Sequence, residues 1–290
     1  MTVKKKSGCK VNLMLNILGR REDGFHELET LMLPVPVYDE LSFDEGNEGI
    51  RLTCSDPGLP TDSSNLIWKA AEAFFHRAGL KPSIGIHLEK RIPTAAGLGG
   101  GSGNAAMTLL ALNEMHSGAL DDEALDEICA GLGSDVNFFL RNLPSLAFGR
   151  GEQVEVLSGA PALEGHWLML VNPGFGVSTP WAYKNLARFP EDLNGRKGRA
   201  AELADQLRDG GSSLGGLDLY NSLEAPVLEK YPILVMLQEK MIETGAARAM
   251  MSGSGATTFA LFETEDQARK SEQTIREHFG PAFWTSITAL

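Results

Sequence analysis

The stretch Pro93–Gly103, PTAAGLGGGSG, is the part of the sequence that decides the fold. Five of its eleven residues are glycine, and it lies between a predicted strand and a predicted helix that begins near Asn104. Glycine lets backbone N–H groups converge without interference from Cβ atoms. Converging amides at a helix N-terminus bind anions, so the stretch predicts a polyphosphate site. The alternative is a flexible surface loop, which need not lead into a helix.

This loop differs from the two commonest phosphate-binding signatures. It contains no lysine and no GxxxxGK[ST] pattern. It also lacks the GxGxxG spacing. Counted from Gly97 and Gly99, the third glycine would fall at Ser102, and counted from Gly99 and Gly101, it would fall at Asn104. The sequence therefore predicts a phosphate-binding loop of another kind.

Hydrophobic periodicity around the loop predicts alternating helices and strands. Strands are predicted at 9–17, 28–38, 84–88, 167–171, 258–262 and 283–290, and helices at 65–78 (capped by Ser63 or Ser64), 104–116, after Asp121, after Thr179, at 233–243 and after Thr264. Pro34 and Pro36 restrict the second strand to an edge or a bulged segment. The irregular alternation favours an α+β fold over a doubly wound sheet. The small-residue stretch 157–165 predicts a boundary between lobes at 1–157 and 158–290.

Composition limits the kind of protein. The chain has 290 residues, 43% of them hydrophobic, which is enough for a sizeable core. Its net charge of −12 argues against nucleic acid as a partner. Three cysteines without a CxxC pair argue against disulfides and zinc, and no apolar run has the length of a membrane span. We expect a cytoplasmic protein, a monomer or homodimer, without nucleic-acid or membrane partners.

Three further motifs carry chemistry. Lys10 and Asn12 lie on the polar face of the first strand, which either lines a cleft or is solvated. Asp135, flanked by apolar residues in GSDVN, is either a helix cap or a functional carboxylate. The stretch Met251–Thr258, MSGSGATT, either approaches the glycine loop or forms a simple turn.

Taken together, in this order and spacing, these four motifs resemble those of the GHMP kinase family. The resemblance spans nearly the whole chain. A narrower resemblance, to members that act on 4-diphosphocytidyl-2-C-methyl-D-erythritol, is carried by KVNL at 10–13, GRREDGFHEL at 19–28, SNLI at 64–67, the GLGGGS core, GSDV at 133–136, GRGE at 149–152 and NSLE at 221–224.

The resemblance implies a two-lobed α+β GHMP kinase fold, with the active site in the cleft between the lobes. It implies ATP-dependent phosphorylation of the 2-hydroxyl of that cytidine diphosphate compound, in non-mevalonate isoprenoid biosynthesis, with magnesium as a cofactor. The enzymatic alternative is a kinase for a homoserine- or mevalonate-like alcohol, which would not need Phe25 and His26. The second alternative is a non-catalytic nucleotide-binding protein, which would not need both Lys10 and Asp135.

The resemblance also implies roles for single residues. Asp135 is expected to be the general base, and Lys10 to hold it ionised and to orient the hydroxyl. Asn12, Phe25 and His26 are expected to bind the substrate, with Phe25 stacking on the cytosine. Asn65 and Leu66 are expected near the adenine. The ATP phosphates are expected at Pro93, Thr94, Ala95, Ala96, Gly97, Leu98, Gly99, Gly100, Gly101, Ser102 and Gly103, with Ser102 also near the magnesium ion.

Four positions depart from the family pattern. Phe25 stands in place of a tyrosine, and Cys9 in place of an alanine. Gly103 replaces the second serine of the loop, so that only its backbone can contact a phosphate. Asn137 replaces a proline after Asp135, which predicts a looser backbone there.

Overall fold

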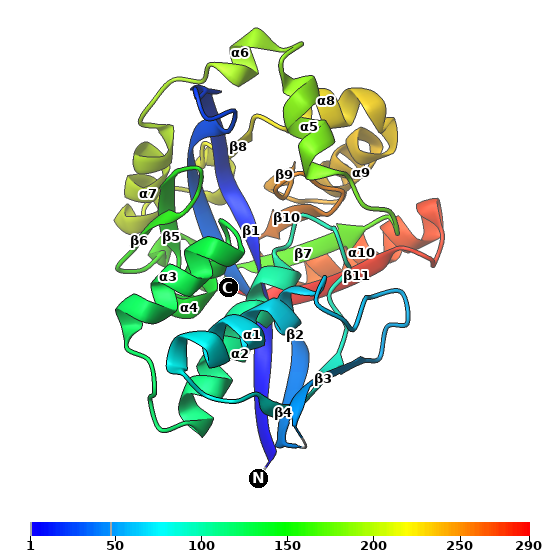
Figure 1. Cartoon of the computed structure of the whole chain (residues 1–290). Helices are drawn as coiled ribbons and strands as arrows, with labels where there is room; N and C mark the ends of the chain where they lie inside the picture. The colour runs from blue at the N-terminus through cyan, green and yellow to red at the C-terminus, as the bar shows by residue number, and fades with distance from the viewer. Residues whose placement is uncertain (1, 47) are drawn as a thin grey trace. The chain divides into compact units, whose positions relative to one another are not determined.

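The computed structural model describes residues 2–46 and 48–290 (Figure 1). By internal contacts the chain forms two compact units. Unit 1 contains Met1–Cys9, Pro36–Ile92 and Gly99–Asn142, and unit 2 contains Lys10–Val35, Pro93–Leu98 and Leu143–Leu290. The predicted lobes at 1–157 and 158–290 stay a prediction.

Two long strands supply residues to both units. Strand β1 runs over Thr2–Arg20 and β2 over His26–Glu45, both longer than predicted. Of the two alternatives predicted for β2, the edge position is wrong, because β2 lies between β1 and β4 in its sheet and also pairs with β5; the bulged segment stays a prediction. Pro34 and Pro36 fall between the residues that pair with β5, Leu28–Met32, and those that pair with β4, Glu40–Glu45. Their missing N–H groups therefore cost no hydrogen bond to either strand.

Unit 1 joins β3 (Gly49–Cys54) and β4 (Ser83–Glu89) to β2 and packs four helices together. These helices are α1 (Leu66–Ala78), α2 (Gly100–Met115), α3 (Asp122–Leu132) and α4 (Val136–Arg141). Buried phenylalanines fill the core of this unit. Asn65 caps α1 in place of the predicted serines, whereas the predicted cap of α3, Asp121, is confirmed.

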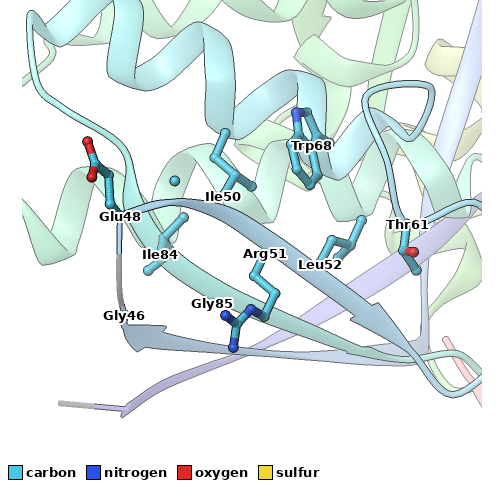
Figure 2. A pocket seen from close by; sticks show the side chains of 10 residues that line it. Gly46, Glu48, Ile50, Arg51, Leu52, Thr61, Trp68, Ile84 and Gly85 are labelled. Carbon is cyan, nitrogen blue, oxygen red and sulfur yellow. The ribbon is translucent and has the colours of Figure 1, made fainter.

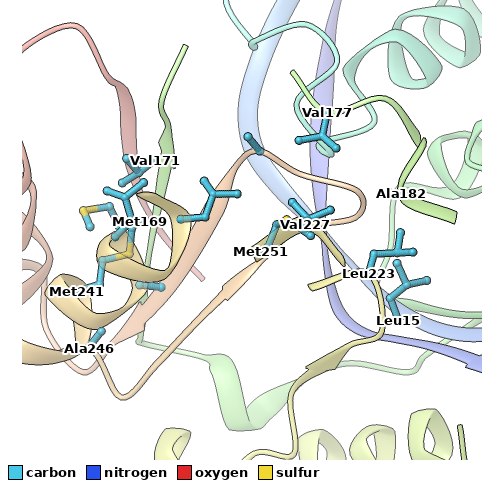
Figure 3. Packing of buried hydrophobic residues seen from close by; sticks show 14 of the residues in the cluster. Leu15, Met169, Val171, Val177, Ala182, Leu223, Val227, Met241, Ala246 and Met251 are labelled. Carbon is cyan, nitrogen blue, oxygen red and sulfur yellow. The ribbon is translucent and has the colours of Figure 1, made fainter. Parts of the chain in front are cut away.

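Unit 2 contains an antiparallel sheet in the order β11-β7-β10-β9. Its strands are β7 (Trp167–Asn172), β9 (Arg248–Met251), β10 (Thr258–Phe262) and β11 (Trp284–Ala289). The other elements of the unit are β5 (Ser145–Gly149), β6 (Gln153–Val156), β8 (Tyr220–Asn221), α5 (Thr179–Leu186), α6 (Pro190–Leu193), α7 (Arg199–Asp209), α8 (Glu224–Lys230), α9 (Pro232–Glu243), α10 (Glu265–Phe279) and short 3-10 helices at Pro161–Leu163 and Leu214–Gly216. Figure 3 shows the apolar core that α5, α8 and α9 form with this sheet.

Helices α1 and α9 begin within one residue of the predicted starts, and two other starts differ in position or in their caps. Helix α2 begins at Gly100 rather than near Asn104, so three of the loop glycines lie in its first turn. Helix α5 is capped by Ser178, one residue before the predicted cap Thr179. The predicted capping box of Thr264 and Gln267 is confirmed. No helix in the described part of the chain combines the length and apolar character that a membrane span requires.

Candidate active site

In unit 2 the glycine loop is held by the late glycine-rich stretch. The Ser252 hydroxyl donates to the Gly97 carbonyl at 3.0 Å, and the Thr257 N–H donates to the Ala96 carbonyl at 3.2 Å. A Cβ atom on Gly97, which has a φ of 78°, would lie only 2.0 Å from the Ser252 carbonyl oxygen. Of the two alternatives for MSGSGATT, the structure thus shows the one in which it contacts the loop.

Strand β1 contacts the same assembly. The Lys10 N–H donates to the Leu98 carbonyl at 2.9 Å, and the Asn12 N–H donates to the Ser252 hydroxyl at 3.3 Å. The Lys10 ammonium donates to the Asn12 side-chain oxygen, and the Asn12 amide donates to Thr30. Lys10 and Asn12 are each 3% exposed, which rules out a solvated polar face.

In unit 1 the first turn of α2 carries the other half of the glycine stretch. Its cap, Gly99, has a φ of 67° and no side chain to satisfy the first amides of the helix. The first N–H groups of a helix have no partner within it, so these amides are suited to an anion. The ammonium of Lys90 lies 3.3 Å from where a Cβ atom on Gly100 would be. Ser102 is half-buried in the same turn.

Gly103 packs directly against strand β1. A Cβ atom at this position would lie 2.8 Å from the Gly8 carbonyl oxygen and 2.9 Å from the Ser7 hydroxyl. The Ser7 hydroxyl is buried without a hydrogen-bond partner among the described residues. This close packing explains why glycine, rather than the serine of the family pattern, stands at 103.

Asn65 and Leu66 lie where α1 begins. The Asn65 side chain accepts from the Ile67 N–H at 2.9 Å and donates to the Pro60 carbonyl at 2.7 Å. Its side chain therefore shapes the start of α1. Leu66 reaches toward α2, because its Cδ1 lies 3.7 Å from a Cβ position on Gly101.

Asp135 occupies the N-cap position of α4, but its side chain makes no capping hydrogen bond. The carboxylate is half-buried. The following turn is held by Asn137, whose amide donates to the Asp126 carbonyl at 3.2 Å, and by Arg141, whose guanidinium binds both Asp126 carboxylate oxygens at 2.6 and 2.7 Å. These side-chain contacts with α3 support the turn where the family pattern has a proline, and the looser backbone after Asp135 stays a prediction.

Phe25 and His26 follow a tight turn between β1 and β2. The Phe25 ring is 55% exposed, and the Arg150 guanidinium lies 4.9 Å from its centroid. The His26 ring lies 5.0 Å from the ring of Tyr183. Burial, and to a smaller extent the charge of Arg20, lower the pKa of His26. Its imidazole is thus neutral at pH 7 and offers one donor and one acceptor.

Sequence reasoning did not identify Tyr183 or Arg150 as neighbours of this pair. Arg150 lies in the GRGE motif that contributed to the resemblance, so a signal existed for it. Tyr183 lies within α5 and had no local signal, because nothing in its own segment distinguishes it from a packing residue.

Comparison with known proteins identifies the family. The family model for the GHMP kinases N terminal domain matches residues 65–142, and the model for the GHMP kinases C terminal domain matches residues 191–280. The 4-diphosphocytidyl-2-C-methyl-D-erythritol kinase of Syntrophotalea carbinolica is 40% identical over 274 residues, which cover 94% of each chain. The chain belongs to the 4-diphosphocytidyl-2-C-methyl-D-erythritol kinases of the GHMP kinase family.

Solved structures agree with this membership. A crystal structure of a 4-(cytidine 5'-diphospho)-2C-methyl-D-erythritol kinase has a TM-score of 0.81 and 32% identity, and the match covers 99% of this chain and all of that one. A homoserine kinase from Cytophaga hutchinsonii has a TM-score of 0.75 at 18% identity, covering 99% and 93% of the two chains, which shows only a shared fold. The α+β GHMP kinase fold and an ATP-dependent kinase are therefore confirmed.

The candidate residues of this GHMP kinase fall into both units. Unit 2 holds Lys10, Asn12, Phe25, His26 and the loop residues Pro93–Leu98, and contacts join the strand to the loop. Unit 1 holds Asn65, Leu66, Gly99–Gly103 and Asp135. The position of the active site in a cleft between lobes stays a prediction.

Unit 1 also contains a pocket of about 290 Å3 (Figure 2). It is lined by residues of β3, by Ile84 and Gly85 of β4, and by Trp68 and Thr61. None of the residues predicted for the active site of this kinase lines it, and we assign it no catalytic role.

Proposed function

We propose that the protein transfers the γ-phosphoryl group of ATP to the 2-hydroxyl of 4-diphosphocytidyl-2-C-methyl-D-erythritol, a step of non-mevalonate isoprenoid biosynthesis. The observation that carries this substrate assignment is the group formed by Phe25, His26 and Tyr183 in unit 2. A homoserine- or mevalonate-like alcohol contains no aromatic ring that such a group would recognise.

The pyrimidine ring of the substrate is held by this aromatic group. The exposed Phe25 ring provides a stacking face, and stacking on a base contributes about 1–3 kcal/mol. The neutral His26 imidazole can donate to and accept from the base edge. The guanidinium of Arg150, which lies over the Phe25 ring, adds a positive charge, which suits a diphosphate.

The ATP phosphates bind at the glycine stretch. The uncapped amides at the head of α2 favour an anion there, whereas the nearby Lys90 ammonium is already paired with the buried Asp39 carboxylate. Asn65 and Leu66, at the start of α1, lie near the adenine. Within the described residues no cluster of three or more histidine, cysteine, aspartate or glutamate side chains could hold a metal. Magnesium fits nonetheless, because Mg2+ is commonly held by substrate phosphates with few protein oxygens. Ser102 supplies one such oxygen, and the ion would neutralise phosphate charge.

Proton removal falls to Asp135. Its half-buried carboxylate lies at the start of α4, and a carboxylate is a suitable acceptor for the proton of the substrate hydroxyl. Lys10, fixed on β1 by Asn12, stabilises the ionised carboxylate and orients the hydroxyl. Phosphoryl transfer then depends on positioning and on charge neutralisation.

A phosphoryl-transfer assay with a panel of alcohols tests the proposal. We expect turnover with 4-diphosphocytidyl-2-C-methyl-D-erythritol. With homoserine and mevalonate, kcat/KM should be lower by a factor of about 100 or more, because their binding cannot use the aromatic group. Comparable turnover with homoserine or mevalonate would overturn the substrate assignment. ATP binding without turnover of any alcohol would favour the non-catalytic alternative.

A further inference from the structure

The motif Asn221-Ser222-Leu223-Glu224 contributes to the family resemblance but has no role in the proposed chemistry. Asn221 is 2% exposed, and its side-chain amide donates to two carbonyls of the glycine turn, Met251 and Gly253, each at 2.8 Å. Its side-chain oxygen accepts from the Leu223 N–H at 2.9 Å. All hydrogen-bonding atoms of this buried side chain are therefore used, and two of its bonds hold the glycine turn.

Glu224, the first residue of α8, also contacts the first residue of this turn. Its carboxylate accepts from the Met251 N–H at 2.7 Å and from the side-chain amide of Gln238 on α9 at 2.5 Å. Asn221 and Glu224 thus bind the carbonyl and the N–H of one residue, Met251. Leu223 and Met251 belong to the same apolar cluster as Leu15 of β1 (Figure 3).

Ser222 connects the motif to the strand that carries Lys10 and Asn12. The Ser222 N–H donates to the Leu15 carbonyl at 2.8 Å, and its hydroxyl accepts from the Ile17 N–H at 3.0 Å. The motif consequently contacts both neighbours of the glycine loop, the 251–256 turn and β1.

We infer that Asn221 and Glu224 are positioning residues for nucleotide binding: by fixing Met251 they set the turn at 251–256 against the glycine loop. The connection runs through Ser252, which follows Met251 and whose hydroxyl donates to the Gly97 carbonyl. A Cβ atom on Gly253 would lie 3.0 Å from that same carbonyl, so turn and loop are packed closely. A small displacement of the turn therefore displaces Gly97.

Protonation of Glu224 is linked to this arrangement. Burial raises the pKa of Glu224 to about 7, and both of its hydrogen-bond donors are neutral. The elements packed around Glu224 carry these charged side chains: Lys184 on α5, Glu239, Lys240 and Glu243 on α9, and Arg248 on β9. Of these, Lys240 pairs with Glu243, and Arg248 donates to the Leu217 carbonyl. The ionised carboxylate is disfavoured where it is buried, so a rise in pH from the ordinary pKa of 4.5 through about 7 increasingly favours states in which the turn has moved away, and the effect levels off at higher pH.

Steady-state kinetics between about pH 5 and pH 8, with KM measured separately for ATP and for the cytidine alcohol, test this inference. Glu224→Leu and Asn221→Asp should raise KM for ATP about tenfold, because each leaves buried backbone groups of the turn without a partner. Glu224→Gln retains an acceptor for Met251, so it should come nearest to the wild type at about pH 5, close to the ordinary pKa of 4.5. As the pH rises through about 7, the wild-type KM for ATP should rise relative to that of Glu224→Gln and then level off.

Glu229→Gln, on the exposed side of α8 where Glu229 pairs with Arg188, is the matched control and should behave as the wild type. If Glu224→Leu does not fold, the pH profile of Glu224→Gln decides. Equal KM for ATP in the wild type and Glu224→Gln at every pH, with an unaffected Asn221→Asp, would overturn the inference.

Because the inference rests on the proposed function, calorimetric binding of a non-hydrolysable ATP analogue is measured with the same variants. Weaker analogue binding in the variants supports the positioning role even if the wild type does not phosphorylate the cytidine alcohol. Normal turnover in the wild type with unchanged analogue affinity in the variants contradicts the positioning role and leaves the substrate assignment intact.

Discussion

At the scale of single residues, Asp135 is placed where a helix cap is expected, yet its side chain does not cap. Asp135→Asn removes the proton acceptor while keeping the size of the side chain. We expect kcat to fall by ~10²–10⁴-fold, the usual contribution of a general base, with ATP affinity unchanged. The measurement is single-turnover kinetics together with nucleotide titration. Asp266→Asn, at an exposed position in the first turn of α10, is a control that leaves Asp135 and its helix untouched; near-normal kcat in Asp135→Asn would contradict the assignment.

His26 is predicted to affect one substrate and not the other. His26→Ala removes a neutral hydrogen-bonding group, which contributes about 0.5–1.5 kcal/mol, so KM for the cytidine alcohol should rise roughly 2- to 12-fold while KM for ATP stays unchanged. His278→Ala, an exposed position on α10, serves as the control. If His26 only stabilised the turn, both KM values would drift together and the melting temperature would fall.

The same histidine predicts a pH dependence. Burial, followed by the charge of Arg20, lowers the pKa of His26, so the ring stays neutral below the ordinary value of 6.5. We expect the wild-type KM for the cytidine alcohol to be constant above pH 6.5 and to rise only below it, and this acid limb should be absent in His26→Ala. A rise that begins above pH 6.5 would contradict the neutral-ring assignment.

At the scale of elements, α4 shows how a departure from the family pattern is accommodated. Asn137 is the second residue of α4, where a backbone N–H has no partner within the helix, so proline is tolerated. Asn137→Pro also removes a buried side-chain oxygen that has no hydrogen-bond partner among the described residues. We expect near-normal kcat and a change in unfolding free energy within about 1 kcal/mol.

Leu140→Pro is the matched control for this prediction, because it falls where the α4 ladder is formed and should cost about 3 kcal/mol or more. Thermal unfolding and kcat of the two variants provide the comparison. Equal losses in both would show that Asn137, rather than the bidentate Arg141–Asp126 pair, holds the helix that begins after Asp135.

Local signals account for the elements that the sequence predicted correctly. Asp121 and the Thr264–Gln267 capping box act within one helical turn, so their consequences can be read from adjacent residues. The predicted start of α2 was too late because consecutive glycines resemble a loop. In the structure these glycines form the first turn of the helix, and one of them, Gly103, packs against Gly8 and Ser7. The edge position predicted for β2 failed because the sequence does not show that β5 and β4 pair with different parts of one strand.

The candidate site was predictable only in part for the same reason. Gly97 and Ser252 each lie in a recognisable glycine-rich stretch, so both were identified, but their contact depends on how distant segments pack. Glu224 was recognised only as part of a motif. Its burial and its bond to Met251 follow from the packing of α8 and α9, which its own segment does not encode.

At the scale of the whole molecule, β1 and β2 contribute residues to both units, so loss of either strand removes core residues from each. We expect a single cooperative unfolding transition. Trp68 lies in unit 1, whereas Trp167, Trp181 and Trp284 lie in unit 2. One variant retains only Trp68, so its tryptophan fluorescence reports on unit 1, and the Trp68→Phe variant reports on unit 2. In each variant the denaturant midpoint from fluorescence should equal the midpoint from circular dichroism. Different midpoints would show that the units unfold independently.

The pairing of β1 with β8 has a consequence for synthesis on the ribosome. Met14 and Leu15 pair with Tyr220 and Asn221, which are translated about 200 residues later. At 5–20 residues per second, that edge of β1 waits roughly 10 to 40 s for its partner. During this time the nascent chain exposes unpaired backbone groups beside the apolar residues of β1, which is the surface that chaperones bind and that unfinished chains use to aggregate. Because the segments leave the ribosome in this order, β1 of this enzyme needs protection from aggregation until Tyr220 and Asn221 have been synthesised.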